Sequence, residues 1–304
     1  MTFADQLARA ARLTEARLET ILDDAATPSR LAAALKHGVL GGGKRFRPLL
    51  VLESARLLGA NEAAALDTAA ALECIHCYSL VHDDLPVMDN DELRRGQPTV
   101  WKAYDEWTAI LAGDALLTLA FEIIASSKAI EPTVQSALIA DLARASGRNG
   151  MVGGQQLDLE ADKLSRPKTP TLDHIRQLQA MKTGALIRFA CTAGAHLAAG
   201  SQSSTHGGKQ DDLAALRTYG DNLGFAFQIS DDLLDITGDI ATVGKAVAKD
   251  AAAGKATLVS LMGLEAARAR LAEVEADAIA ALAPYGAKAD TLRDAARYVS
   301  RRTS

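Results

Sequence analysis

Apolar residues recur at helical spacing along most of the chain. From Leu271 to Leu282 they lie three or four residues apart, with acidic residues between them. Similar patterns run over residues 7–22, 49–58 and 110–124. No Asn-Gly turn separates two alternating segments, so the pattern gives no sign of a β-hairpin. The sequence therefore predicts an all-α fold.

Five stretches rich in glycine, proline or small polar residues interrupt the helical pattern, and we expect loops there. They cover residues 41–43, 86–98, 165–171, 200–208 and 237–254. No shift in composition marks a domain boundary, and no segment repeats. We therefore predict one helical domain over residues 1–304, built as a single-domain bundle.

The charge balance and apolar content exclude several classes of protein. The 304 residues include 33 basic and 38 acidic side chains, a net charge of −5, which argues against a nucleic-acid partner. The segment nearest to a membrane span, residues 184–200, is interrupted by Arg188 and His196, so no membrane insertion is expected. The first residues lack the apolar core of a signal peptide, which predicts a cytoplasmic protein.

The three cysteines are too few for a disulfide framework. Cys74 and Cys77 are spaced as in a redox or metal motif. They lie in a helical pattern with no second pair, which favours two small buried thiols on one helix.

Two clusters of aspartates follow apolar helical segments. The first contains Asp83, Asp84 and Asp89, and the second contains Asp231, Asp232 and Asp235. In the second cluster the three carboxylates share one edge of a helix, because residues three or four apart lie on the same face. In the first, Pro86 cannot continue a helix, so Asp89 must return through a loop.

Like charges one turn apart destabilise a helix, and burial of carboxylates is costly unless they are neutralised. A solvated surface would explain one such cluster. Two clusters, each after an apolar helix, favour bound divalent cations. Mg²⁺ suits sites that combine a few carboxylates with substrate phosphates.

Basic residues accompany both clusters, and arginine and lysine are the usual partners of phosphate oxygens. Singly, each would be read as a solvated surface charge. With two metal-type clusters they indicate a substrate that carries phosphate. They are Lys44, Arg45, Arg47, Arg94, Arg95, Lys182, Lys245 and Lys255.

Ordered motifs over nearly the whole chain resemble the trans-type (class I) polyprenyl diphosphate synthases, and especially the bacterial farnesyl diphosphate synthases. The motifs are GGKRFRP at 42–48, ECIHCYSLVHDDLPVMDNDELRRGQPT at 73–99, GDALL at 113–117, GGQQLDL at 153–159, MKTGAL at 181–186 and FQISDDLLD at 227–235. Gly-Lys pairs follow at 244–245 and 254–255. The resemblance implies an all-α bundle around a deep central cavity, and a homodimer.

The resemblance also implies a ligand set. The two aspartate clusters would bind three Mg²⁺ ions that hold an allylic diphosphate (dimethylallyl or geranyl diphosphate), together with Arg94, Lys182 and Lys245. The pocket for isopentenyl diphosphate would contain Lys44, Arg47, His76 and Arg95. Lys255 matches a further lysine near the site.

The chemistry of this family fits the residues present. Ionisation of the allylic carbon–oxygen bond leaves diphosphate and a carbocation, which the double bond of isopentenyl diphosphate attacks. Loss of a proton then gives a chain longer by five carbons. No protein nucleophile is needed. Lys182, Thr183 and Gln228 are the candidates for stabilising the cation.

Tyr78 lies five residues before Asp83, about 7.5 Å deeper along a helix that rises 1.5 Å per residue. With Ser79 beside it, a ring there could form a floor under the growing chain and stop it at farnesyl diphosphate. The alternative for Tyr78 is an ordinary core tyrosine with a hydrogen-bonded hydroxyl.

Other functions remain open from the sequence. A synthase could stop at the C20 or the C10 product instead. A class I terpene cyclase would usually lack the second aspartate cluster, and a non-catalytic synthase subunit would have lost motif residues. Trp101 stands where the family often has histidine, and the sequence does not explain this difference.

Overall fold

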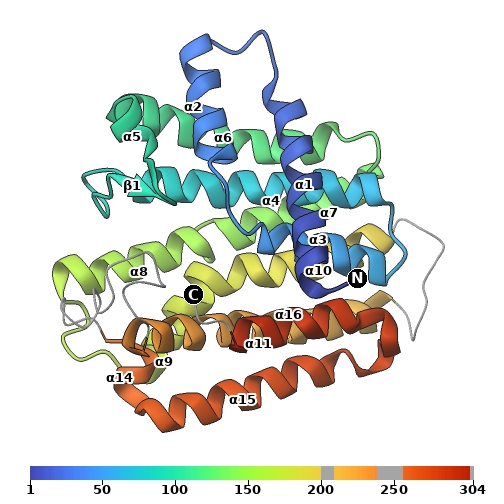
Figure 1. Ribbon diagram of the computed structural model, residues 1–304, viewed down its shortest axis with the longest axis vertical. Coiled ribbons are helices and arrows are strands. Elements are labelled where there is room, and N and C mark those ends of the chain that lie inside the picture. Colours follow the sequence, from blue (N-terminus) through green and yellow to red (C-terminus); the bar gives the residue numbers. More distant parts are fainter. Residues whose placement is uncertain (200–208, 238–255, 302–304) are drawn as a thin grey trace. The chain divides into compact units, whose positions relative to one another are not determined.

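The computed structural model describes residues 1–199, 209–237 and 256–301 (Figure 1). The predicted loop 200–208, most of the predicted loop 237–254, and both Lys245 and Lys255 lie outside the described residues. Apart from two short strands, all regular elements of the described part are helices, so the predicted all-α class is confirmed.

The chain divides into two compact units. Unit 1 comprises residues 1–140 and 193–204, and unit 2 comprises residues 141–192 and 205–304. Two helices pass from one unit to the other, α7 (Pro132–Ser146) and α10 (Ala185–Ala199).

Unit 1 is organised around one long buried helix. The helices that lie within it are α1 (Phe3–Leu22), α2 (Ser29–Leu40), α3 (Phe46–Leu57), α4 (Glu62–Asp83), α5 (Val100–Ala103) and α6 (Glu106–Ser126). Helix α4 begins at Asn61, whose side chain accepts hydrogen bonds from two backbone N–H groups of the first turn, as an N-cap does. Most of its side chains are buried, so α4 forms the core of the unit.

Helices α4 and α6 run side by side (Figure 1). Gly113 of α6 makes this close approach possible, because a Cβ atom there would lie 2.0 Å from Nε2 of His82. The His82 ring instead reaches across α6, with its Nε2 3.0 Å from the carbonyl oxygen of Ile110. The end of α4 that precedes the first aspartate cluster is thereby attached to α6.

A small hairpin follows the first cluster, which the sequence pattern did not predict. Strands β1 (Leu93–Arg94) and β2 (Gln97–Pro98) pair antiparallel around Arg95 and Gly96. Both turn residues have positive φ, as a two-residue hairpin turn requires. The expectation was wrong because an arginine, rather than asparagine or aspartate, occupies the first turn position.

Unit 2 is built around α11 (Lys209–Thr237). In Figure 1 this helix lies beside α15 (Leu264–Ala281) and α16 (Asp290–Arg301), and the hydroxyl of Tyr219 donates to the carbonyl of Leu292. The remaining elements are α8 (Met151–Leu164), α9 (Leu172–Gln179), the π-helical turn η1 (Ala180–Gly184), α14 (Leu258–Met262) and η2 (Ala283–Ala289).

All three cysteines are buried and free. Burial raises the pKa of Cys77 to about 12, so its thiol stays protonated at neutral pH. The burial of both residues agrees with the interpretation of Cys74 and Cys77 as core residues.

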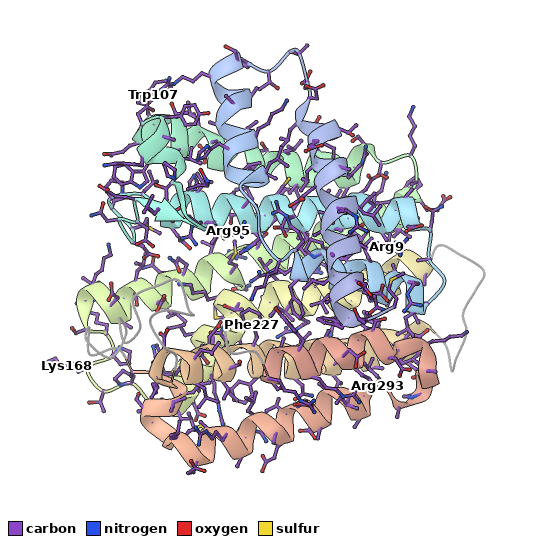
Figure 2. The ribbon with its side chains drawn as sticks, viewed as in Figure 1. Arg9, Arg95, Trp107, Lys168, Phe227 and Arg293 are labelled. Carbon is purple, nitrogen blue, oxygen red and sulfur yellow. The ribbon has the colours of Figure 1, made fainter. Side chains whose placement is uncertain are left out.

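Helix α6 is long and apolar enough to cross a membrane by length and composition alone, and 44% of its most apolar 18-residue window is buried. The expectation that residues 184–200 come nearest to a span was therefore wrong. The exposed apolar side chains at the start of α6 are Trp107, Ile110 and Leu111, the first of which is labelled in Figure 2.

Candidate active site

The first aspartate cluster forms a closed loop at the end of α4. The helix ends at Asp83, as Pro86 predicts, and the backbone N–H of Asp89 donates to the carbonyl of Asp83 over 2.8 Å. This bond brings the two ends of the cluster together. Trp101 fixes the following segment, because its indole N–H donates to the carbonyl of Asp91 over 2.9 Å. The structure thus gives Trp101 a role that the sequence did not.

Within this cluster, Asp84 differs from its neighbours. It is only 3% exposed, and the Arg94 guanidinium donates to its carboxylate through Nε and Nη2 over 2.5–3.0 Å. Burial raises the pKa of the Asp84 carboxyl above its usual value, despite the opposing effect of Arg94. Asp83 is partly exposed and Asp89 is exposed. Asp84 therefore orients Arg94, while the other two carboxylates lie nearer the surface.

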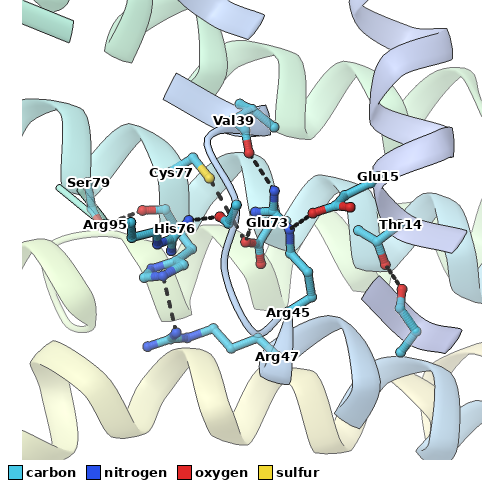
Figure 3. Close-up of polar contacts among 12 residues, drawn as sticks. Thr14, Glu15, Val39, Arg45, Arg47, Glu73, His76, Cys77, Ser79 and Arg95 are labelled. Carbon is cyan, nitrogen blue, oxygen red and sulfur yellow. Dashed lines mark hydrogen bonds and ion pairs between the residues drawn. The ribbon is translucent and has the colours of Figure 1, made fainter. Parts of the chain in front are cut away.

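Three of the four residues predicted to bind isopentenyl diphosphate lie close together in unit 1. Nη1 of Arg47, on the first turn of α3, lies 3.4 Å from Nε2 of His76 on α4 (Figure 3). Arg95 donates to the carbonyl of Gly42, and its guanidinium fills the space where a Cβ of Gly43 would be. The fourth, Lys44, is exposed on the same loop before α3.

His76 is held neutral by its surroundings. Burial lowers its pKa well below 6.5, and the positive charges of the nearby arginines lower it further. A neutral imidazole can accept a hydrogen bond from Arg47, which a protonated one cannot. The arginines that act on it are, in order of effect, Arg47, Arg95, Arg94 and Arg45.

This depressed pKa predicts a pH-dependent stability. Below about pH 6.5 the unfolded chain binds a proton at His76 and the folded chain does not, so protonation favours the unfolded state. The free energy of unfolding therefore keeps its full value above that pH. It decreases as the pH falls toward the folded-state pKa, by about 1.4 kcal/mol per pH unit. Urea unfolding at stepped pH values measures the slope. We expect His76→Gln to reduce the slope and the control His174→Gln to retain it. An unchanged slope in His76→Gln would contradict this assignment.

The two chain-length residues lie on the last turns of α4. Tyr78 is 5% exposed, and its ring packs edge-on against His82 with centroids 5.9 Å apart. Ser79 is partly buried and donates to the carbonyl of His76. Tyr78 thus lies buried one turn before His82, and its role in setting the product length stays a prediction.

The second cluster lies on the last turns of α11. Asp231, Asp232 and Asp235 are partly buried there, with Gln228 one turn earlier. One oxygen of Asp232 accepts from the backbone N–H of Leu258 over 2.8 Å and lies 3.5 Å from Nε2 of Gln179. The Asp232 side chain thus attaches α11 to the start of α14.

Lys182 and Thr183 lie in the π-helical turn η1, a distortion frequent at functional sites. The Lys182 ammonium lies 2.6 Å from a carboxylate oxygen of Asp158 on α8, which is 7% exposed. Gly154 allows η1 to approach α8 closely, because a Cβ atom there would lie 2.2 Å from the backbone nitrogen of Lys182. The GGQQLDL segment therefore orients Lys182.

A family model for polyprenyl synthetases matches residues 28–286 and spans both units. The chain belongs to the polyprenyl synthetase family. It is 45% identical to the farnesyl diphosphate synthase of Escherichia coli, over 80% of this chain and 79% of that protein. It is 42% identical to a chloroplastic geranylgeranyl pyrophosphate synthase of Arabidopsis thaliana, over 79% of this chain and 65% of that protein.

The crystal structure of an FPP/GFPP synthase from Zymomonas mobilis superimposes with a TM-score of 0.85 and 42% identity, and each chain is covered to 98%. These similarities confirm the isoprenoid-synthase type of all-α fold. This polyprenyl synthetase is a short-chain trans-prenyltransferase, which condenses isopentenyl diphosphate with an allylic diphosphate.

The residues of both clusters fit Mg²⁺ by chemistry, because carboxylate oxygens are its preferred protein ligands and it retains sites for substrate phosphates. The bond from Asp89 to Asp83 holds the ends of the first cluster together. Among the described residues, no group of three His, Cys, Asp or Glu side chains is already arranged around a metal position.

Three residues of this polyprenyl synthetase carry structural roles that the sequence did not assign. Asp158 pairs with Lys182, Trp101 holds the loop after Asp89, and Arg45 lies buried before α3. The sequence did contain a sign that Asp158 is functional, because this residue lies in the GGQQLDL motif. Arg45 could not be separated from Lys44 and Arg47 by residue type alone.

Proposed function

We propose that this enzyme makes farnesyl diphosphate, by adding isopentenyl diphosphate first to dimethylallyl and then to geranyl diphosphate. One domain over residues 1–304 would carry out both additions, in the cytoplasm. The likeness to relatives whose names include both C15 and C20 synthases makes geranylgeranyl diphosphate the alternative product.

The observation that carries this proposal is the group of Arg47, His76 and Arg95 in unit 1. Arg47 lies 3.4 Å from a neutral His76, and Arg95 lies over the adjacent glycine loop. A terpene cyclase has one diphosphate to bind and no need of a second cationic group. A non-catalytic subunit would not be expected to keep this group together with both aspartate clusters.

Magnesium ions, when bound, would neutralise the charge that develops on the departing diphosphate. Asp83, Asp84 and Asp89 in unit 1, and Asp231, Asp232 and Asp235 in unit 2, are the proposed ligands for three ions. In the structure Asp84 instead orients Arg94, so we expect Asp83 and Asp89 to provide most of the first set.

Arg94, Lys182 and Lys245 would bind the allylic diphosphate directly. Arg94 and Lys182 are each held by a buried carboxylate, so their charges are in place before the bond breaks. Such preorganised charges stabilise the leaving group without reorganisation during the reaction. Lys255 would add a further positive charge.

The carbocation would be stabilised by Thr183, Gln228 and the backbone carbonyl of Lys182. In a π-helical turn the regular hydrogen-bond ladder is interrupted, so a carbonyl of η1 is suited to this role. An apolar environment would keep water from the cation. The diphosphate that has left would accept the proton.

A product assay tests the proposed function. Purified enzyme is incubated with dimethylallyl diphosphate, labelled isopentenyl diphosphate and Mg²⁺, and the dephosphorylated products are separated by length. A dominant C15 alcohol that disappears with EDTA is the expected result. A C20 product would support the alternative. No condensation would contradict the proposal, and conversion of geranyl or farnesyl diphosphate to a cyclic product would indicate a cyclase.

The exposed start of α6 supports a homodimer. Trp107, Ile110 and Leu111 are 58%, 45% and 50% exposed on a helix that is rich in apolar residues. A second copy of the same chain would cover them, since contiguous exposed apolar side chains mark interaction surfaces. Homo-oligomers are most often symmetric pairs that use one surface on both subunits.

The double variant Trp107→Glu/Leu111→Glu is expected to be monomeric, because charges would be buried without partners at the interface. Light scattering coupled to size exclusion measures the mass. Leu164→Glu, at a residue of similar exposure on α8, serves as the control and should remain dimeric. A wild-type monomer, or a dimeric double variant, would refute this surface as the interface.

A further inference from the structure

Arg45 lies between two residues of the proposed isopentenyl diphosphate site but does not share their exposure. Its side chain is fully buried, whereas Lys44 is exposed and Arg47 is partly exposed. An arginine in such a position cannot contact a solvated diphosphate. Its function must be sought in the contacts that it makes inside unit 1.

Each part of the Arg45 guanidinium contacts a different helix of unit 1 (Figure 3). Nη1 lies 2.6 Å from the carboxylate of Glu73 on α4, and Nη2 donates to the carbonyl of Val39 on α2 over 2.6 Å. Nε donates to Glu15 on α1 over 3.3 Å. The loop before α3 is thereby attached to three helices at once, a set of contacts that the single ammonium of a lysine could not make.

The backbone of Arg45 needs these contacts. Its φ is +48°, in the left-handed region that residues other than glycine rarely adopt, and its carbonyl accepts the first hydrogen bond of α3 from Leu49. A strained conformation of this kind persists only where the surroundings hold it. The direction in which α3 begins therefore depends on the buried guanidinium.

The residues of α4 that contact Arg45 and Arg47 lie on one face of that helix. Glu73 pairs with Arg45, and His76, three residues later, contacts Arg47. Residues three apart on a helix are neighbours, so the buried ion pair lies directly beside the contact between Arg47 and His76. A displacement of Arg45 would be transmitted to Arg47 through less than one helical turn.

We propose that Arg45 is a positioning residue for isopentenyl diphosphate. Its buried contacts with Glu73 and Val39 fix the loop so that Lys44 and Arg47 present their charges to the second diphosphate. This inference rests on the proposed function of Lys44, Arg47 and His76. It adds a residue that acts through others and does not touch the substrate.

Two variants test this role by steady-state kinetics. Arg45→Lys keeps the charge next to Glu73 and loses the contacts with Val39 and Glu15. Arg45→Met/Glu73→Leu removes both members of the pair, which avoids leaving a buried charge without a partner. In both we expect KM for isopentenyl diphosphate to rise by about tenfold or more, since errors near 1 Å in a positioned group can cost about 10²-fold. KM for the allylic substrate and kcat should change by less than about threefold, as when binding alone is weakened.

Arg17→Met is the matched control. Arg17 also pairs with a buried carboxylate of α4, Asp67, over 2.7 Å, and Asp67 lies six residues, about 9 Å along the helix, before Glu73. Its loss should lower the melting temperature and leave both KM values unchanged. A general loss of stability is in this way separated from a loss of positioning.

An unchanged KM for isopentenyl diphosphate in both Arg45 variants would overturn the inference. A fall in kcat with a similar rise in both KM values, of the same size as in Arg17→Met, would also overturn it. Arg47→Met separates this failure from a failure of the proposed site. If Arg47→Met also leaves KM for isopentenyl diphosphate unchanged, the assignment of that site is wrong, and if it raises KM, only the role of Arg45 is refuted.

Discussion

Replacing Asp83 or Asp231 by alanine is expected to lower turnover by at least about 10²–10³-fold, the usual effect of removing one preorganised electrostatic contribution to a transition state. Each change removes one proposed Mg²⁺ ligand, from unit 1 and unit 2 respectively.

The same substitutions should leave the helices intact or slightly more stable. Asp83 is the last residue of α4, where the helix dipole disfavours a negative charge. Asp231 lies one turn before Asp235 on α11, and like charges at that spacing repel. A loss of activity without a loss of stability is what separates a ligand from a structural residue.

Matched controls exist on the same two helices. Glu62 at the start of α4 and Asp221 on α11 are exposed carboxylates in surface ion pairs, with Arg9 and Arg188. Glu62→Ala and Asp221→Ala should retain activity within about twofold, because exposed pairs contribute little. Turnover, circular dichroism and the Mg²⁺ concentration for half-maximal rate are measured on all four variants. Full activity in either Asp83→Ala or Asp231→Ala would refute the metal assignment for that cluster.

The sequence predicts this fold well where local rules decide it. Apolar spacing places the helices near residues 7–22 and 110–124, and Pro86 ends α4 after the first aspartates. Arg95 and Gly96 form a hairpin turn that does not match the usual turn sequences, because positive φ at an arginine depends on its tertiary contacts. The π-helical turn at Lys182 depends likewise on the close approach of Gly154.

Residue type alone cannot separate binding residues from residues that position them. Asp83 and Asp84 are adjacent and identical in type, yet Asp84 is buried against Arg94. Arg45 and Arg47 are two residues apart, and only Arg47 is partly exposed. These distinctions arise from the packing around each residue in unit 1, which the motif alone does not specify.

Tyr78→Ala is expected to shift the dominant product from C15 to C20 or longer. Tyr78 is buried one and a half helical turns before Asp83, about 7.5 Å along the axis of α4. A prenyl chain whose diphosphate is bound at Asp83 would reach this ring after a few additions. Removing the ring removes the barrier, and each further addition then competes with product release.

The ring itself, and not its hydroxyl, should set the length. Burial, with the nearby charge of Asp83, raises the pKa of Tyr78 to about 12, so the side chain is neutral at the pH of the reaction. The matched variant Tyr78→Phe keeps the ring and should still give a dominant C15 product. Chromatography of the dephosphorylated alcohols distinguishes the outcomes. If Tyr78→Ala gives the wild-type distribution, Tyr78 is not the floor. If Tyr78→Phe also lengthens the product, the hydroxyl takes part in stopping the chain.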